Sequence, residues 1–376
     1  MSGRNREAAV QDLLDRAVKA GLAPGLVGLA VLRDGGGRAW CAGHLWVGGP
    51  PVDPHALYDL ASLTKPLATG TLLVLAMRDG LELQAPLAEF LPELHGSPWA
   101  EVSLEACATH TAGFPPWAPL YGDGASHRDA YLKALAGTSP AAPPGTRVEY
   151  SCLGFIALGL VLERGFGASL GALFAELVAS PLELDGELLF APRLETVTAA
   201  GQGKWTVEKA KLAELALPGC PPPARPGTVP CDDGNARGLG GEAGNAGLFG
   251  TAAAVASLAA EYLPGGGILL TGEEASLATR CRTGSMPHRR SLGWQLAGTP
   301  GCSAGPSLPA SAAGHTGFTG TSLWLDGVSG TMLVLLANRL HPGGRTPDLH
   351  PLRRRFHSLA MASLGLPGKR ERAGQP

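Results

Sequence analysis

The chain lacks the features that would mark it as a membrane protein or a nucleic-acid-binding protein. No run of about 18 apolar residues occurs in its 376 residues, which argues against a membrane-spanning helix. Thirty lysines and arginines are balanced by 32 aspartates and glutamates, so no basic field attracts nucleic acid or an acidic membrane surface. We therefore expect neither among its partners, and no sequence feature indicates an obligate protein partner.

Metal-binding and disulfide patterns are also missing. The seven cysteines are scattered, odd in number and never arranged as C-x-x-C, and the few histidines near them lack the spacing of zinc ligands. Positive charges near the first residue are not followed by the apolar segment of a signal peptide, and residues 8–19 instead have the spacing of an amphipathic helix. We therefore expect a cytoplasmic protein that uses no metal or cofactor.

What the chain does contain is the composition of a large globular protein, with 45% hydrophobic and 16% charged residues. Short apolar segments bounded by turn residues predict strands at residues 26–32 and 38–46, and again at 322–326 and 331–337. Between residues 62 and 226 helical patterns dominate. The sequence thus predicts strands towards both ends of the chain and helices in its middle.

The most informative short motif is the tetrapeptide Ser-Leu-Thr-Lys at residues 62–65. A serine hydroxyl is a weak nucleophile at neutral pH and needs a nearby base. Residues three apart share one face of a helix, so Lys65 can hold its amine beside the Ser62 hydroxyl. In the first turn of a helix, unpaired backbone N–H groups would also favour developing negative charge. Taken alone, however, the spacing is better explained by a capping serine and a solvated lysine.

Two further motifs follow in order along the chain. Residues 150–152 read Tyr-Ser-Cys, and residues 315–317 read His-Thr-Gly shortly before the strand-like segment 322–325. With S-x-x-K, they resemble the Y-S-N and K-T-G motifs of the serine β-lactamase/penicillin-binding-protein superfamily, in its class C-like serine hydrolase branch. Weaker similarity extends over nearly the whole chain, including the glycine-rich stretch 240–252.

The resemblance implies an α+β fold of the β-lactamase/D,D-peptidase type. In that fold an antiparallel sheet from both chain ends is flanked by helices and receives an all-helical inserted region. We accordingly predict that residues 1–61 and 227–376 form an α/β sheet domain. Residues 62–226 would form the mainly helical region that carries the nucleophile.

The same resemblance implies the catalytic roles. Ser62 would be the acylated nucleophile, and Lys65, buried beside it, would have its ammonium form disfavoured by desolvation and act as the base. Tyr150 would relay the proton between the nucleophile, the leaving group and water.

Residues near the C-terminal motif would bind the substrate. Thr316 and Gly317 would line the strand along which the substrate lies, with Gly317 allowing close backbone approach. The backbone N–H groups of Ser62 and Phe318 would form the oxyanion hole. His315 replaces the lysine of K-T-G, and because histidine is mostly neutral at pH 7, it would not attract a substrate carboxylate as a lysine does.

The main departure from the family pattern is Cys152, which stands where an asparagine is expected. A thiol is a weak donor and a poor acceptor, so recognition of an acyl amide should be weakened. Catalysis by Cys152 itself is an alternative, but no histidine pairs with it in a recognisable motif. We expect a structural role for His110, and place Trp294 either at the pocket rim or in the core.

These features predict a serine hydrolase that forms an acyl-enzyme with a small ester or amide. Among the possible activities we favour that of a carboxylesterase. A cytoplasmic chain meets no cell-wall crosslinks, and His315 and Cys152 replace the usual lysine and asparagine. One alternative is an amidase that resembles D,D-peptidases or β-lactamases. Another is a catalytically weak binding protein that keeps the fold. In every case the ligand would be a small molecule.

Overall fold

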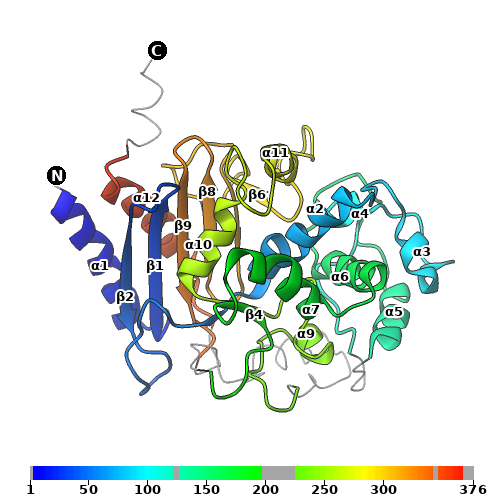
Figure 1. Cartoon of the computed structure of the whole chain (residues 1–376), viewed down its shortest axis with the longest axis horizontal. Coiled ribbons are helices and arrows are strands. Elements are labelled where there is room, and N and C mark those ends of the chain that lie inside the picture. The colour runs from blue at the N-terminus through cyan, green and yellow to red at the C-terminus, as the bar shows by residue number, and fades with distance from the viewer. Residues whose placement is uncertain (1–2, 122–126, 197–224, 342–345, 367–376) are drawn as a thin grey trace.

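The structure, a computed structural model, describes residues 3–121, 127–196, 225–341 and 346–366. A large sheet occupies one end of the molecule, and helices from the middle of the chain gather at the other end (Figure 1). The first and last helices lie side by side against the sheet.

The large sheet has six strands in the order β2-β1-β9-β8-β7-β6, and every neighbouring pair is antiparallel. A smaller sheet has the order β3-β5-β4. The strands are β1 (Gly25–Leu32), β2 (Gly37–Gly43), β3 (Tyr58–Asp59), β4 (Leu188–Phe190), β5 (Leu248–Gly250), β6 (Gln295–Leu296), β7 (Ala313–Thr316), β8 (Ser322–Asp326) and β9 (Thr331–Ala337). The expectation of an antiparallel sheet built from both chain ends is confirmed, although β2 ends before the predicted residue 46.

The α-helices are short, apart from three of 14 to 17 residues. They are α1 (Gly3–Lys19), α2 (Thr71–Arg78), α3 (Leu87–Phe90), α4 (Leu104–Ala108), α5 (Arg128–Ala136), α6 (Cys152–Phe166), α7 (Leu170–Phe174), α9 (Gly234–Gly238), α10 (Ala252–Ala260), α11 (Gly272–Thr279) and α12 (His350–Ser363). Among the described helices no single one is long and apolar enough to cross a membrane. One pair, α6 with residues 170–182, passes that test by length and composition, but is bent by 77°.

Strand β9 shows how the large sheet is covered on both faces. Met332 and Val334 belong to the core shared with α10 and the helical region, whereas Leu333 and Leu335 belong to the cluster beneath α1 and α12. Successive side chains of a strand point to opposite faces, so a continuous apolar strand such as β9 can be buried on both. Figure 1 shows α10 on one face of the sheet and α12 behind it.

The segment that carries the S-x-x-K motif is not a regular α-helix. Ser62 lies in a 3₁₀ turn (Ala61–Leu63), residues 65–70 form a π-helical turn, and α2 begins only at Thr71. Ser62 therefore lies in the first turn of a continuous helical segment, as predicted, but that turn is 3₁₀ rather than α-helical. Pro66 has no N–H to donate to the carbonyl group of Ser62 four residues earlier, so one α-helical hydrogen bond is absent there.

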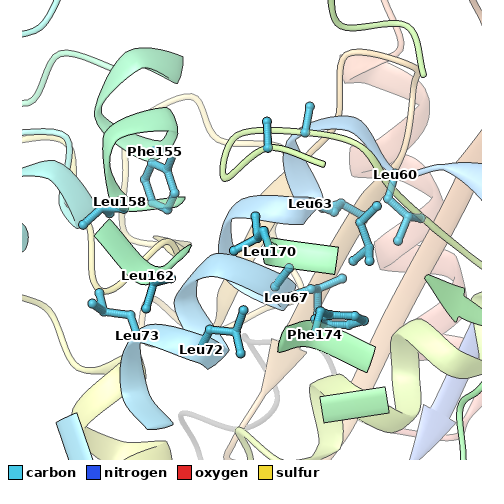
Figure 2. Packing of buried hydrophobic residues seen from close by; sticks show 14 of the residues in the cluster. Leu60, Leu63, Leu67, Leu72, Leu73, Phe155, Leu158, Leu162, Leu170 and Phe174 are labelled. Carbon is cyan, nitrogen blue, oxygen red and sulfur yellow. The ribbon is translucent and has the colours of Figure 1, made fainter. Parts of the chain in front are cut away.

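Apolar side chains from three segments pack around this irregular helix (Figure 2). Residues 60–73 are called the nucleophile segment below, because they carry the predicted nucleophile Ser62. Those labelled are Leu60, Leu63, Leu67, Leu72 and Leu73 of this segment, Phe155, Leu158 and Leu162 of α6, and Leu170 and Phe174 of α7. Each is at most 2% exposed. Burial of one such side chain contributes about 1.5–3 kcal/mol, so the nucleophile segment is held by the core of the helical region.

Phe356 of α12 anchors the cluster on the opposite face of the sheet. Its ring is fully buried and lies edge-on to Trp40, with ring centroids 6.3 Å apart. It also fills the space above Gly28, where an added Cβ would lie 2.6 Å from the ring.

We expect Phe356→Ala to lower the free energy of unfolding by about 3–5 kcal/mol, because apolar burial is lost and a cavity remains. Urea unfolding followed by circular dichroism measures this loss. The exposed neighbour Arg355 provides the control, since Arg355→Ala should change stability by no more than about 0.5 kcal/mol. Equal effects of the two substitutions would contradict the assignment.

Candidate active site

A cavity of ≈ 580 Å³ brings the three sequence motifs together. Ser62 lines it from the 3₁₀ turn, Tyr150 and Cys152 from the start of α6, and residues 315–319 from the end of β7 and the turn after it. Of the predicted site residues only Lys65 does not line the cavity. It is fully buried and contacts Ser62.

The Ser62 hydroxyl lies between two donors. Lys65 Nζ is 3.0 Å from Ser62 Oγ, and the Tyr150 hydroxyl is 2.8 Å from it. Lys65 Nζ also donates to the backbone carbonyl of Asn245 at 3.0 Å and lies 3.6 Å from Cys152 Sγ. Side chains from distant parts of the sequence thus converge on one hydroxyl, as nucleophilic catalysis by serine requires.

The charge on Lys65 differs from the prediction. Burial acts to lower its pKa, but the Cys152 thiol and Tyr150 act in the opposite direction, and the net pKa is raised. Burial also raises the pKa of Tyr150. Desolvation thus disfavours the ammonium form, as predicted, but it does not decide the net direction of the Lys65 pKa. Lys65 is a cation and Tyr150 a neutral phenol, so the pair must lose one proton before it can accept that of Ser62.

The residue before the nucleophile is strained. Ala61 has a φ of 48°, a left-handed value that costs a residue with a Cβ on the order of 1–2 kcal/mol. Asp59 holds it in place, because Oδ1 accepts the Ala61 N–H at 2.8 Å. Asp59 Oδ2 accepts the N–H of Asp232, which lines the cavity, at 2.7 Å. Burial raises the pKa of this carboxyl to about 6, although both backbone donors act to lower it.

The turn after β7 approaches the nucleophile segment so closely that only glycine fits at position 317. A Cβ there would lie 2.1 Å from Thr321 Oγ1 and 2.6 Å from the carbonyl oxygen of Leu60. Thr321 Oγ1 donates to that same carbonyl at 3.1 Å, and Thr319 Oγ1 donates to the carbonyl of Asp59 at 2.7 Å. Gly317, which was predicted to permit close backbone approach, therefore allows the turn after β7 to pack directly against the nucleophile segment.

Arg353 of α12 holds the same turn from its other side. Its guanidinium donates to the carbonyl groups of Gly317 at 2.8 Å, Thr321 at 3.1 Å and Gly320 at 3.2 Å. Burial lowers the pKa of Arg353 to about 10, so it remains charged at neutral pH. This turn carries Phe318, whose N–H group is one of the two predicted oxyanion donors. That role of the N–H group stays a prediction.

His315 presents an acceptor rather than a charge. Its Nδ1 lies 2.9 Å from the carbonyl oxygen of Thr316, which can only accept, so the proton is assigned to Nδ1 and Nε2 carries a lone pair. Nε2 is buried and has no hydrogen-bond partner. Burial, together with Lys65 and Arg290, lowers the pKa of His315 well below its usual range. The expectation of a neutral ring at this position agrees with this environment.

Cys152 contacts Lys65 but cannot replace the hydrogen bonds of an asparagine side chain. Lys65 finds its second acceptor in the backbone carbonyl of Asn245 instead. The Asn245 side chain is fully buried, and neither of its amide atoms has a hydrogen-bond partner. Sequence analysis missed Asn245 because the acceptor is a carbonyl oxygen, which every residue type has.

Two residues outside the motifs behave differently from each other. His110 is buried, accepts the N–H of Ser151 at 3.1 Å on Nδ1, and packs against the Tyr150 ring with centroids 4.7 Å apart. It supports Tyr150, in agreement with the expected structural role. Trp294 is fully buried and lies edge-on to Tyr262, 5.0 Å away, so it belongs to the core and not to the pocket rim.

Sequence analysis also missed three charged residues of the site. Asp59 could have been found, since it lies three residues before the predicted nucleophile. Arg290 lies outside the three motifs, and Arg353 lies on a helix remote from all of them. Burial and contacts in the folded chain distinguish these two from other arginines.

The family model described as Beta-lactamase matches residues 10–357. The chain belongs to this family. It is 27% identical over 334 residues to a "Putative D-alanyl-D-alanine carboxypeptidase" of Escherichia coli (strain K12), covering 82% of this chain and 75% of the relative. It is 35% identical over 152 residues to "Esterase EstB" of Burkholderia gladioli, covering 36% and 38%.

Solved structures support the same fold. The chain resembles "EstCE1, a hydrolase with promiscuous acyltransferase activity", with a TM-score of 0.73 and 20% identity, over 95% of this chain and 99% of that one. The predicted α+β fold and membership of the superfamily are confirmed. The chain is a serine hydrolase of the Beta-lactamase family.

Asp59 predicts opposite effects of pH on activity and stability. Activity should fall as the pH is lowered through about 6, because protonation weakens the acceptors for Ala61 and Asp232. Stability should change in the other direction. A carboxyl whose pKa is raised on folding binds its proton more readily in the folded chain, so its contribution improves as the pH falls.

Asp59→Asn should remove both trends and lower kcat by a factor of about 5 to 200, because an amide oxygen can satisfy only one of the two N–H groups. The measurements are kcat and urea stability between about pH 5 and about pH 8. The exposed Asp79 provides the control, and Asp79→Asn should retain both trends. An acid limb that persists in Asp59→Asn would rule out this role.

Proposed function

We propose that this protein hydrolyses a small ester or amide through an acyl-enzyme on Ser62, with carboxylesterase activity leading. One observation carries the proposal: Ser62 Oγ lies 3.0 Å from Lys65 Nζ and 2.8 Å from the Tyr150 hydroxyl, on the wall of a ≈ 580 Å³ cavity. A cavity of that volume suits a small molecule.

In the proposed reaction Ser62 Oγ bonds to the substrate's acyl carbon. The Lys65–Tyr150 pair first releases one proton to solvent, then takes the proton of Ser62 and delivers it to the leaving oxygen or nitrogen as the scissile bond breaks. Water then attacks the acyl carbon, the pair takes the water's proton, and Ser62 regains a proton as the acid leaves. The N–H groups of Ser62 and Phe318 would stabilise the oxyanion, each contributing about 3–4 kcal/mol.

Two observations favour esters over amides. His315 is neutral, and Cys152 offers no amide to hold the substrate's acyl amide. The 35% identity with an esterase over part of the chain supports the same choice. The second candidate activity is that of an amidase or peptidase. It is favoured by the similarity, over most of the chain, to the "Putative D-alanyl-D-alanine carboxypeptidase" of Escherichia coli. A non-catalytic binding role is less favoured, because Ser62, Lys65 and Tyr150 keep a catalytic arrangement.

The proposed reaction takes place in the cytoplasm and involves only a small-molecule substrate. It needs no metal or cofactor, because the Lys65–Tyr150 pair moves the proton. Within the described residues, no group of three or more His, Cys, Asp or Glu side chains is placed to hold a metal ion. The proposal includes no nucleic acid, membrane or obligate protein partner.

A fluorophosphonate probe tests the nucleophile. We expect wild-type protein to gain the mass of one probe less HF, located on the peptide that contains Ser62, because this hydroxyl lies between two proton-transfer groups and displaces the probe's fluoride. Ser62→Ala should remove the labelling, as measured by intact-mass spectrometry. The exposed Ser276 on α11 provides the control, and Ser276→Ala should label like the wild type. Labelling that survives in Ser62→Ala would sink the assignment.

Cys152→Asn tests the missing amide. Restoring an asparagine beside Lys65 should raise kcat/KM on an amide substrate by a factor of about 5 to 200, since it restores one hydrogen bond in the transition state. The gain on a simple phenyl ester should be smaller, because that substrate presents no acyl amide. Cys281→Asn, on the exposed surface, is the matched control and should change neither rate. A silent or harmful Cys152→Asn on both substrates would show that Cys152 has another role.

A further inference from the structure

Three arginines line the active cavity, and two of them are held by the protein itself. Arg353 donates to three backbone carbonyl groups of the turn after β7. Arg339 donates to the carbonyl groups of Phe318 at 2.6 Å and Pro347 at 2.7 Å. Both of these guanidinium groups are engaged in shaping the cavity wall.

Arg290, the third, has no such partner. Its residue is only 8% exposed, its Nε atom is buried without a hydrogen bond, and it forms no ion pair within the described part of the chain. Its described contact is with the face of the Tyr150 ring, whose centroid lies 5.8 Å from Cζ. Burial lowers its pKa to about 10, so it is still a cation at neutral pH.

An unpaired charge at such a depth is costly unless an anion compensates it. No carboxylate is among the groups that affect the pKa of Arg290, which are Tyr150 and Cys302 after burial itself. Among the described residues no anion compensates the charge of Arg290, so an anion bound in the cavity would. The open side of Arg290 is the cavity that also holds Ser62.

We propose that Arg290 is an anion subsite of the active cavity and binds a carboxylate of the substrate. Because this subsite serves the hydrolysis proposed above, it rests on the proposed function. A guanidinium can bind a carboxylate through two parallel hydrogen bonds, which fixes orientation as well as charge. Gln295, whose backbone pairs with that of Arg290, lines the cavity too and can donate a further hydrogen bond.

The position of Arg290 fits a substrate acylating Ser62. The Tyr150 hydroxyl contacts Ser62 Oγ, and the ring of the same tyrosine lies against Arg290. Tyr150 therefore contacts both the residue that would bind the acyl carbon and the residue that would bind the carboxylate. His315 cannot serve instead, because it is neutral and its free Nε2 carries a lone pair that repels a carboxylate.

The subsite changes the expected substrate class. The absence of a lysine at position 315 predicted indifference to anionic substrates, but Arg290 restores a cation from a different segment of the chain. The substrate class becomes a small ester or amide that carries a carboxylate. That carboxylate belongs to either the acyl part or the leaving group, which the two substrate pairs below distinguish.

The test compares two matched pairs of esters. One pair is mono-p-nitrophenyl glutarate and its methyl ester, with the charge on the acyl part. The other is p-acetoxybenzoate and its methyl ester, with the charge on the leaving group. The readout is the ratio of kcat/KM for the anionic ester to that for its neutral partner, in wild type, Arg290→Gln, Arg290→Lys and Arg289→Gln. Arg289 is an exposed neighbour and is the matched control.

For one of the pairs, we expect the wild-type ratio to exceed that of Arg290→Gln by at least about tenfold, chiefly through KM. Arg290→Lys should keep part of the preference, and Arg289→Gln should keep all of it. Equal ratios in wild type and Arg290→Gln for both pairs would overturn the proposal. So would equal losses on charged and neutral esters, which would mean that Arg290 only supports Tyr150. If Arg290→Gln does not fold, the wild type and Arg290→Lys are compared instead. A preference for the anionic ester that is identical in the two proteins and unaffected by salt would also overturn the proposal.

Failure of the hydrolase proposal would look different. In that case no ester would be cleaved and the fluorophosphonate would leave Ser62 unlabelled. The subsite is then read by titration calorimetry with glutarate and p-hydroxybenzoate, which needs no catalysis. Binding at least about tenfold weaker in Arg290→Gln than in Arg289→Gln would support the subsite, and equal binding would overturn it.

Discussion

The active cavity depends on the close approach of the turn after β7 to the nucleophile segment. Gly317 makes this approach sterically possible, and the hydroxyl groups of Thr319 and Thr321 secure it by donating to the carbonyl groups of Asp59 and Leu60, just before the strained Ala61. Arg353 closes the arrangement from α12. Ser62 and Phe318 belong to segments far apart in the sequence, so these hydrogen bonds set their relative positions.

Burial then determines which groups carry charge. His315 and His110 lose their positive forms because they are buried near the cations Lys65 and Arg290. Lys65 keeps its proton, since nearby Cys152 and Tyr150 offset the cost of desolvation. The catalytic wall therefore carries positive charge and neutral acceptors, a distribution that suits an anionic transition state.

Replacement of two family residues is compensated by groups from other parts of the chain. Cys152 cannot hold Lys65 as an asparagine would, but the backbone carbonyl of Asn245 does. His315 cannot supply the cation of the K-T-G motif, and Arg290 places one in the same cavity. A site of this family can thus keep its nucleophile and its electrostatics while two of its motif residues change.

The sequence by itself determined the class of fold and predicted the nucleophile Ser62 with its two partners, Lys65 and Tyr150. Motif residues were readable because their chemistry requires particular side chains in a particular order, and strands near both chain ends are short apolar segments between turns. The exchange of asparagine for Cys152 was equally visible.

Only the tertiary structure decided how these residues act. The segment with Ser62 and Lys65 begins with 3₁₀ and π-helical turns, and the surroundings of Lys65 raise its pKa although burial acts to lower it. Asn245 acts through its backbone, and Arg290 is distinguished from other arginines by burial without a partner. Such properties depend on which groups surround an atom in space, and those neighbours come from parts of the chain that no local pattern connects.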